Sequence, residues 1–308
     1  GGTNNGDDVR SRKKIADPLG YLKAGALLDL SKITLSEGEV KLITLVLTGR
    51  LQIEDLGPLL YLALNSPGMD LVAATDEFYQ LSEQQLIANS NAQSPSEVVL
   101  LNPPPLAVIN LSYTDIGDCG MEALSEFLYS KNAALKTVDL SFCNINTQGF
   151  LSLCHGLKTR NSRGLPPIEA LVLAGNTIAN DMGKQLGSAI SSTRTKYHKR
   201  KSGDDRLYSN SPSEGIMLLH LGSTSISMKC LTELLSALGS TCPLQELKLQ
   251  SNRIGPNDAA ILVKFLEGKT DDGLPVLPKL NRLDMSYNEL GDIGTTKLTR
   301  AISKRSKV

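Results

Sequence analysis

The sequence has no excess of charge of either sign, because 32 lysine and arginine residues balance 32 aspartate and glutamate residues. A neutral chain exerts no overall attraction on nucleic acid or on an anionic membrane. The sequence also has no apolar run of about 18 residues, the length that predicts a membrane span. Its richest region, Leu42 to Leu64, is interrupted by Arg50, Glu54 and Asp55. The sequence therefore predicts no membrane-spanning helix.

Cysteine is scarce, and its pattern does not suggest chemistry. The count is odd and no C-x-x-C spacing occurs among Cys119, Cys143, Cys154, Cys230 and Cys242. We interpret the five as reduced core thiols at positions that take small buried residues, in preference to a metal or redox site. This interpretation favours a cytoplasmic protein, with the nucleus as the alternative.

Catalytic motifs are absent. The sequence has no phosphate-binding loop, no H-E-x-x-H, no G-x-S-x-G and no EF-hand pattern. The three histidines, His155, His198 and His220, fall in a predicted helix, a loop and a strand, and none is paired with a nucleophile. We therefore expect a protein that is not an enzyme and that has no cofactor and no metal.

One pattern recurs six times from residue 106 onward. An apolar residue stands at its centre, and others stand five and two positions before it and five, thirteen and seventeen positions after it. All six positions are apolar in all six copies, which chance does not produce in a chain that is 41% hydrophobic. The central residues are Leu111, Leu140, Leu173, Leu221, Leu249 and Met285.

This spacing predicts a strand, a turn and a helix in each copy. Alternate residues of a strand share a face, so the central residue and the one two positions before it point the same way. The last two positions are four apart and share a helix face. One copy of roughly 28 residues buries too few side chains to offset its backbone entropy. The copies must therefore stack into an α/β solenoid with one continuous core.

The pattern resembles the leucine-rich repeats of the ribonuclease-inhibitor-like class. Three positions after the central residue, three copies have an asparagine that can bond neighbouring turns, and the other three have threonine or cysteine; the six are Asn176, Asn252, Asn288, Thr114, Cys143 and Thr224. The resemblance implies a curved parallel sheet inside and α-helices outside. It leaves function open, because the family includes inhibitors, GTPase activators, actin-capping proteins and innate immune sensors.

The chain divides into three predicted parts. Residues 1–17 form a flexible tail. Residues 18–105 form a helical N-terminal cap, with a stiff proline-rich connector at its end and a degenerate repeat at its start that uses Leu28, Leu30, Leu35, Ile43 and Leu47. Residues 106–308 contain the six repeats, with an insertion at 191–214.

Basic residues gather where two adjacent repeats return from helix to strand, and we call this set the basic edge. It comprises Lys158, Arg160, Arg163, Arg194, Lys196, Lys199, Arg200 and Lys201. Two interpretations remain open, a solvated loop or a docking site for an acidic partner, nucleic acid or anionic lipid.

The strand residues that point away from the core are predicted to form a binding face, with aromatic residues at its rim. The candidate partner-binding residues are Tyr113, Asp139, Phe142, His220, Glu246, Lys248, Arg282, Asp284 and Tyr287. Exposed aromatic side chains beside charges are typical of interface anchors. The alternative is that the rim aromatics only pack on adjacent turns.

These observations favour a non-catalytic interaction scaffold that binds a protein through its concave face and its insertion edge. The family resemblance suggests a cytoskeletal protein or a small GTPase as that partner. A regulator of a GTPase or another enzyme is the alternative, as is association with nucleic acid or membrane through the basic edge. We expect the chain to act as a monomer.

Overall fold

The computed structural model describes residues 26–35, 37–48, 106–130, 135–191, 215–239, 242–268 and 277–305. The predicted tail at 1–17, the predicted connector and most of the predicted cap lie outside these ranges. So does the insertion from residue 192 to residue 214.

A single parallel sheet runs through the described part of the chain, and its strands follow one another in sequence order from β1 to β7. The strands are β1 (Ala26–Asp29), β2 (Leu106–Asn110), β3 (Thr137–Asp139), β4 (Ala170–Val172), β5 (Leu218–His220), β6 (Glu246–Lys248) and β7 (Arg282–Asp284). The apolar residues two positions before the central ones stay in register, so that Val138 lies beside Leu171 and Leu219 lies beside Leu247.

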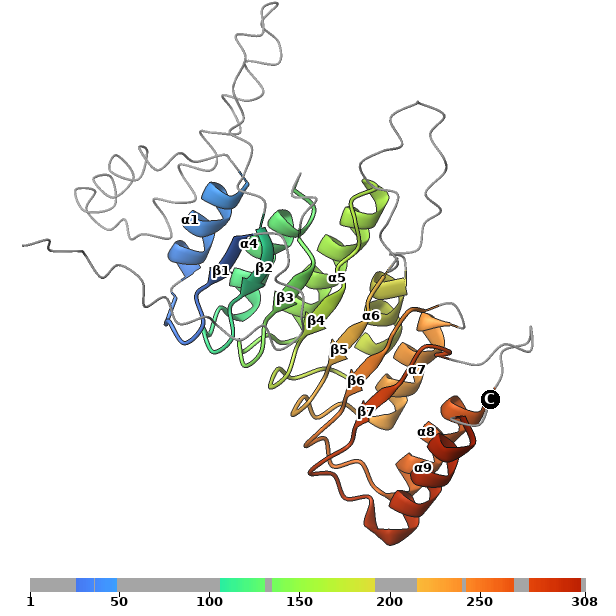
Figure 1. Ribbon diagram of the computed structural model, residues 1–308. Helices are drawn as coiled ribbons and strands as arrows, with labels where there is room; N and C mark the ends of the chain where they lie inside the picture. Colours follow the sequence, from blue (N-terminus) through green and yellow to red (C-terminus); the bar gives the residue numbers. More distant parts are fainter. Residues whose placement is uncertain are drawn as a thin grey trace, which may run out of the picture.

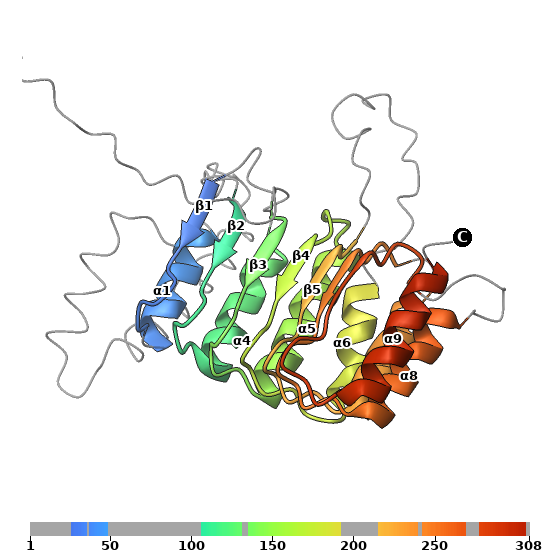
Figure 2. The ribbon, with the colours of Figure 1, turned by 60° about the horizontal axis from the view of Figure 1, so that its bottom comes forward.

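Among the described residues, one helix follows each strand. The helices are α1 (Glu37–Leu47), α4 (Gly117–Leu128), α5 (Thr147–Ser162), α6 (Met182–Ser191), α7 (Met228–Leu238), α8 (Pro256–Glu267) and α9 (Gly291–Arg305). Figures 1 and 2 show these helices along one side of the sheet, with the strands side by side on the other. We call the face of the sheet opposite the helices the concave face. Within the described ranges, no helix is both long and apolar enough to cross a bilayer.

The predicted α/β solenoid is confirmed by the placement of the repeated apolar residues. In the first five copies every one of them is buried between the sheet and the helices, at most 6% exposed. In the sixth copy only Leu298 is buried to this extent. Leu283 and Met285 are half-buried there, and Ile302 is 43% exposed.

Strand β1 and helix α1 occupy the place predicted for a degenerate repeat. Leu28 lies in register with Ile109 on β2. The amide of Leu30 donates to the carbonyl of Asn110 at 2.9 Å, just as the amide of Leu111 donates to the carbonyl of Asp139 at 2.9 Å. The described sheet therefore has one strand more than the six copies of the full pattern.

Buried asparagine side chains connect successive turns of the solenoid. The Oδ1 atom of Asn176 accepts from the amides of Cys143 and Ile145 in the preceding repeat, at 3.1 and 3.0 Å. Its Nδ2 donates to the carbonyls of Leu140 and Leu173, at 2.7 and 3.0 Å. Asn252 and Asn288 make the corresponding bonds to the turns before them. Each asparagine thus satisfies polar backbone groups that would otherwise be costly to bury.

Where threonine or cysteine replaces the asparagine, its backbone carbonyl accepts a hydrogen bond from an amide of the preceding repeat. The carbonyl of Thr114 accepts from the amide of Leu35 at 3.4 Å, and that of Thr224 accepts from Ile178 at 3.2 Å. The carbonyl of Cys143 accepts from the amide of Gly117 at 2.9 Å. In both arrangements, the turn after one strand is held by the repeat that follows it.

We expect replacement of Asn176 by alanine to lower the free energy of unfolding by about 3 kcal/mol, because it leaves several buried backbone groups without partners. Urea denaturation measures this loss. Thr177→Ala, at the exposed neighbouring position, is the control and should change stability by less than about 0.5 kcal/mol. Equal effects of the two substitutions would contradict the role given to the asparagine.

Candidate functional site on the concave face

Three strand residues predicted to face away from the helices form a cluster of their own. Ala170, Val172 and Leu218 make up a small apolar cluster that is distinct from the main core, and all three are buried, at 0%, 8% and 2% exposed. We call this cluster the apolar patch. It lies on β4 and β5, in the middle of the sheet. The concave side of the sheet therefore contains a buried apolar cluster at its centre.

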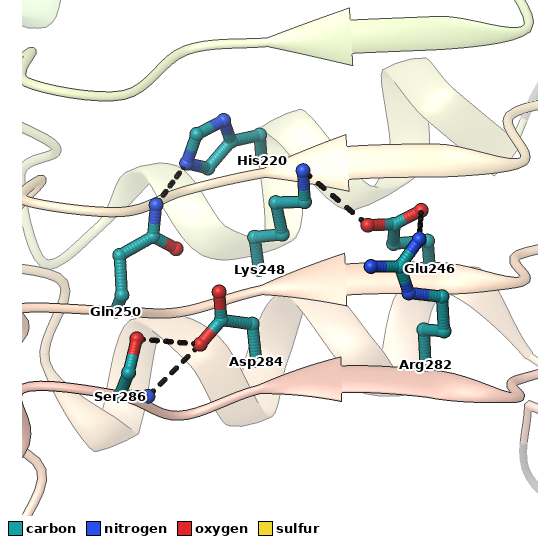
Figure 3. A network of polar contacts seen from close by, with 7 residues as sticks. All are labelled: His220, Glu246, Lys248, Gln250, Arg282, Asp284 and Ser286. Carbon is teal, nitrogen blue, oxygen red and sulfur yellow. Dashed lines mark hydrogen bonds and ion pairs between the residues drawn. The ribbon is translucent and has the colours of Figure 1, made fainter. Parts of the chain in front are cut away.

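Charged side chains from β6 and β7 adjoin the patch. Lys248 Nζ lies 3.3 Å from Glu246 Oε1, and Arg282 Nη1 lies 3.5 Å from Glu246 Oε2. Figure 3 shows the lysine, the glutamate and the arginine projecting from adjacent strands on the same side of the sheet. Partly exposed ion pairs of this kind stabilise a fold only weakly. These ion pairs instead hold the side chains of Lys248, Glu246 and Arg282 in defined orientations.

His220 and Gln250 form a polar contact beside the patch, since His220 pairs with Val172 in the sheet. Gln250 Nε2 lies within hydrogen-bond distance of His220 Nε2 (Figure 3). If the amide donates, the ring nitrogen accepts and the imidazole is neutral. Among the described residues the Gln250 Oε1 atom, although buried, has no hydrogen-bond partner. Burial, followed by the neighbouring positive charge of Lys248, lowers the pKa of His220 below its ordinary value of 6.5.

Aspartate side chains on two strands fold back onto serines. Asp139 Oδ1 accepts from the Ser141 amide at 2.9 Å and from its hydroxyl at 2.7 Å. Asp284 Oδ1 accepts in the same way from Ser286, at 3.0 and 2.7 Å. These bonds, the side-chain one first, lower the pKa of Asp284. The recurring D-x-S spacing is the sequence signal for this feature, which was not predicted.

The rim aromatics are brought together in part. The Tyr113 and Phe142 rings stack with centroids 4.6 Å apart and planes 7° from parallel. They remain 53% and 41% exposed. Tyr287, 87% exposed, follows β7 and is separated from this pair by three strands. The stack supports the packing interpretation for the first two rings, yet it leaves their outer surfaces open to contact.

All three rim aromatics have a strained backbone. Their φ angles are +61°, +55° and +55° for Tyr113, Phe142 and Tyr287. This left-handed conformation disfavours bulky residues by about 1 kcal/mol or more. At the corresponding turn position, smaller residues follow the other strands: Gly175 follows β4, and Ser223 and Ser251 follow β5 and β6. An aromatic ring at such a position is retained against a conformational cost, and this favours a role in binding.

The predicted basic edge is wrong at Arg160. This residue is 1% exposed, and its guanidinium donates to the carbonyls of Pro166, Leu128 and Leu135 at 2.7, 2.9 and 3.2 Å. It therefore closes the end of α4 and the entry to β3 from inside the solenoid.

The other basic-edge residues differ in how much the structure says of them. Lys158 is exposed. Arg163 is exposed as well, and it packs over the Tyr129 ring at 4.6 Å and donates to the Tyr129 carbonyl at 3.0 Å. Arg194, Lys196, Lys199, Arg200 and Lys201 lie outside the described residues. The edge thus has two described surface cations.

The cysteines match the core-thiol interpretation at four positions, and no disulfide joins any of the five. Cys119 is the exception, because it is exposed on α4. Burial raises the pKa of Cys143 and Cys230 to about 11 and that of Cys154 to about 12. In the part of the chain that the structure describes, no group of three or more histidine, cysteine or acidic residues is placed to hold a metal.

A family model of leucine-rich repeats matches three segments of the chain, residues 103–125, 131–154 and 276–298. These segments include β2, β3 and β7 together with the turns and first helical residues that follow them. The chain therefore carries leucine-rich repeats, and strands β4 to β6 continue the same register between the matched segments. No curated protein sequence matches the chain.

We expect NMR titration to give His220 a pKa below 6.5, and Lys248→Met to raise it by removing a neighbouring positive charge. Because the folded pKa is lowered, His220 contributes stability that is fully present above its unfolded value. This stability is lost as the pH falls from about 6.5 through the folded pKa. Lys229→Met, at an exposed lysine of α7, is the control and should leave the titration unchanged. A titration that Lys248→Met does not move would contradict this electrostatic account.

The strain at Tyr287 predicts an unusual order of stabilities. Tyr287→Gly should be more stable than Tyr287→Ala by about 1 kcal/mol, because glycine adopts a positive φ without a Cβ clash. Thermal unfolding of the two variants measures the difference. The control pair is Ile293→Gly and Ile293→Ala, at an exposed position of α9. Here glycine should be the less stable by about 1 kcal/mol, so the same order at both sites would contradict the prediction.

Proposed function

We propose that this leucine-rich repeat protein is a non-catalytic scaffold that binds a protein partner through its concave face. The observation that carries the proposal is the set of oriented side chains of both charges on β6 and β7, beside the buried apolar patch on β4 and β5. Oriented charges of this kind give a surface electrostatic complementarity to a particular partner.

The arrangement favours binding because its side chains are already held in place. Glu246 is paired with two cations, and Gln250 leans over Gly222 to reach His220. Side chains that are ordered before binding lose less conformational entropy when a partner docks. We infer that the partner supplies an acidic group to Lys248.

The finer assignments rest on the same features. A helix after every strand supports the ribonuclease-inhibitor-like class. Four buried cysteines without a disulfide support a reducing compartment, the cytoplasm or the nucleus. Lys158 and Arg163 support a second contact along the insertion edge, to which Arg160 does not contribute.

A photo-crosslinking amino acid at His220, which is half-buried on the concave face, tests the proposal directly. We expect it to crosslink one defined protein, and Lys248→Glu should reduce that crosslink at least tenfold by placing a negative charge opposite the acidic group. Mass spectrometry of the product identifies the partner. It also separates a GTPase or a cytoskeletal protein from nucleic-acid or membrane association, neither of which yields a protein crosslink.

Matched controls on the helical side make the result interpretable. The crosslinker at Lys184 on α6 should give no product, and Lys264→Glu on α8 should leave the His220 crosslink unchanged; both lysines are exposed. The proposal fails if the helical side crosslinks the same protein as efficiently as the concave face.

A further inference from the structure

Two aromatic side chains and a glycine build one stack along the turns that follow β2, β3 and β4. The Tyr113 ring stacks on the Phe142 ring, with centroids 4.6 Å apart. The Phe142 ring in turn lies against Gly175, because a Cβ atom added to that glycine would overlap three carbons of the ring. Three consecutive repeats therefore hold the two rings in place. We call Tyr113 and Phe142 the aromatic step.

The aromatic step presents an open ring face. Phe142 covers one face of the Tyr113 ring, and 53% of Tyr113 is nevertheless exposed. The exposed part therefore lies on the outer face and the edges of that ring. An aromatic side chain that is already held in place loses little conformational entropy when a partner docks. The aromatic step can thus receive a flat group without rearranging.

Carboxylates flank the strand that leads to Tyr113. This strand, β2, ends at Asn110, which pairs with Asp29 on β1 and with Asp139 on β3. Figure 2 shows the three strands side by side. The Oδ1 atom of each of these three residues accepts from the amide of the serine two positions later, at 3.0, 3.0 and 2.9 Å for Asp29, Asn110 and Asp139. These bonds hold both carboxylates next to the turns that carry the aromatic step.

The strands β1 to β3 and the turns after them are acidic as a group. They comprise residues 26–35, 106–116 and 137–145, whose charged side chains are Asp29, Asp115, Asp139 and Lys32. Three negative charges and one positive charge give these segments a formal net charge of −2. Lys136 precedes β3 at the end away from the turns, and its Nζ lies 3.1 Å from Glu169 Oε1. An exposed aromatic face in acidic surroundings attracts a cation.

Arginine matches these surroundings better than lysine does. The guanidinium is planar, so it can stack on the outer face of Tyr113 while its edge donates hydrogen bonds to a neighbouring carboxylate. The lysine ammonium is compact and strongly hydrated, and it has no flat face to stack. An apolar side chain would use the ring but would leave the carboxylates uncompensated.

We propose that the aromatic step binds an arginine side chain of the protein that docks on the concave face. The guanidinium stacks on Tyr113, and Asp29 and Asp139 compensate its charge. The proposal rests on the proposed function only in assigning the arginine to that partner. It adds a contact of opposite sign to the one at Lys248 on β6. A partner with a basic group at one contact and an acidic group at the other fits across the strands in one orientation.

A short peptide tests this chemistry before the partner is known. The probe is glycyl-arginyl-glycine blocked at both ends, and saturation-transfer NMR, which observes the peptide, gives its Kd for the whole chain. We expect a Kd of about 1 mM. The matched peptide with citrulline, which has the shape of arginine without the charge, should bind at least tenfold more weakly, and the lysine peptide at least threefold more weakly.

Substitutions locate the binding. Tyr113→Ser should weaken the arginine peptide at least fivefold, because it removes the stacking face. Serine already occupies this turn position at Ser223 and Ser251, with the same left-handed backbone, so the fold tolerates it. The matched control is Tyr287→Ser, at the same turn position after β7, which should change the Kd less than twofold.

A second pair of variants isolates the charge. Asp139→Asn should weaken the arginine peptide at least threefold. It keeps the turn, since Asn110 accepts the equivalent serine amide at 3.0 Å. Asp284→Asn, in the same D-x-S arrangement on β7, is the control and should change the Kd less than twofold. Thermal unfolding verifies that all four variants fold.

Three results would overturn the proposal. The first is no saturation transfer to the arginine peptide at about 10 mM, and the second is equal binding of the arginine and citrulline peptides. The third is an equal effect of the two tyrosine substitutions. None of them would affect the crosslink at His220. Conversely, a missing crosslink at His220 with intact binding of the arginine peptide would overturn the proposed function and leave the aromatic step as an arginine site.

Discussion

The structure depends on a polar constraint inside an apolar solenoid. Each repeat must turn from strand to helix next to the core, and the turn buries amide and carbonyl groups that cannot be left unpaired. A side chain such as Asn176 satisfies them in three repeats, and a carbonyl such as that of Thr224 does so in others. Both solutions require a neighbour at the correct distance. Stacking is therefore imposed by hydrogen bonding as well as by the burial of apolar surface.

Because of the same constraint, the residues of the concave face are not required to hold the turns together. Because the apolar positions and the polar turns are both satisfied on the helical side, the outward residues of each short strand are not needed for the core. Strands β4 to β7 use this freedom differently, with an apolar patch at Ala170, Val172 and Leu218 followed by the charges around Glu246. Adjacent strands are held about 4.8 Å apart, so the buried apolar side chains and the charged ones lie at fixed positions relative to one another.

The sequence predicted the features that repeat and missed those that depend on a particular neighbour. The spacing of the repeated apolar positions is local, so the burial of Ile109 and Val138 and the strand order followed directly from it. The inward turn of Arg160 did not, because a guanidinium is ordinarily exposed and two of its three carbonyl acceptors, those of Leu128 and Leu135, come from earlier segments of the chain.

The candidate site shows the same division between local and neighbour-dependent features. The positions of Lys248 and Asp284 on the concave face follow from strand alternation alone. The contact of His220 with Gln250 spans two strands, and no spacing within one repeat encodes it. The half-exposed Met285 has the same local pattern as the buried Leu249, and only the absence of a described following strand distinguishes them.

The direction of the turn contacts has a consequence for biosynthesis. Asn252 holds the turn of the repeat before it, and its own amide is held in turn by Asn288. A ribosome makes the chain from the N-terminal end, so each turn emerges before the residue that completes it. During synthesis, the turn of the most recently made repeat therefore lacks these hydrogen bonds until the next repeat has been translated.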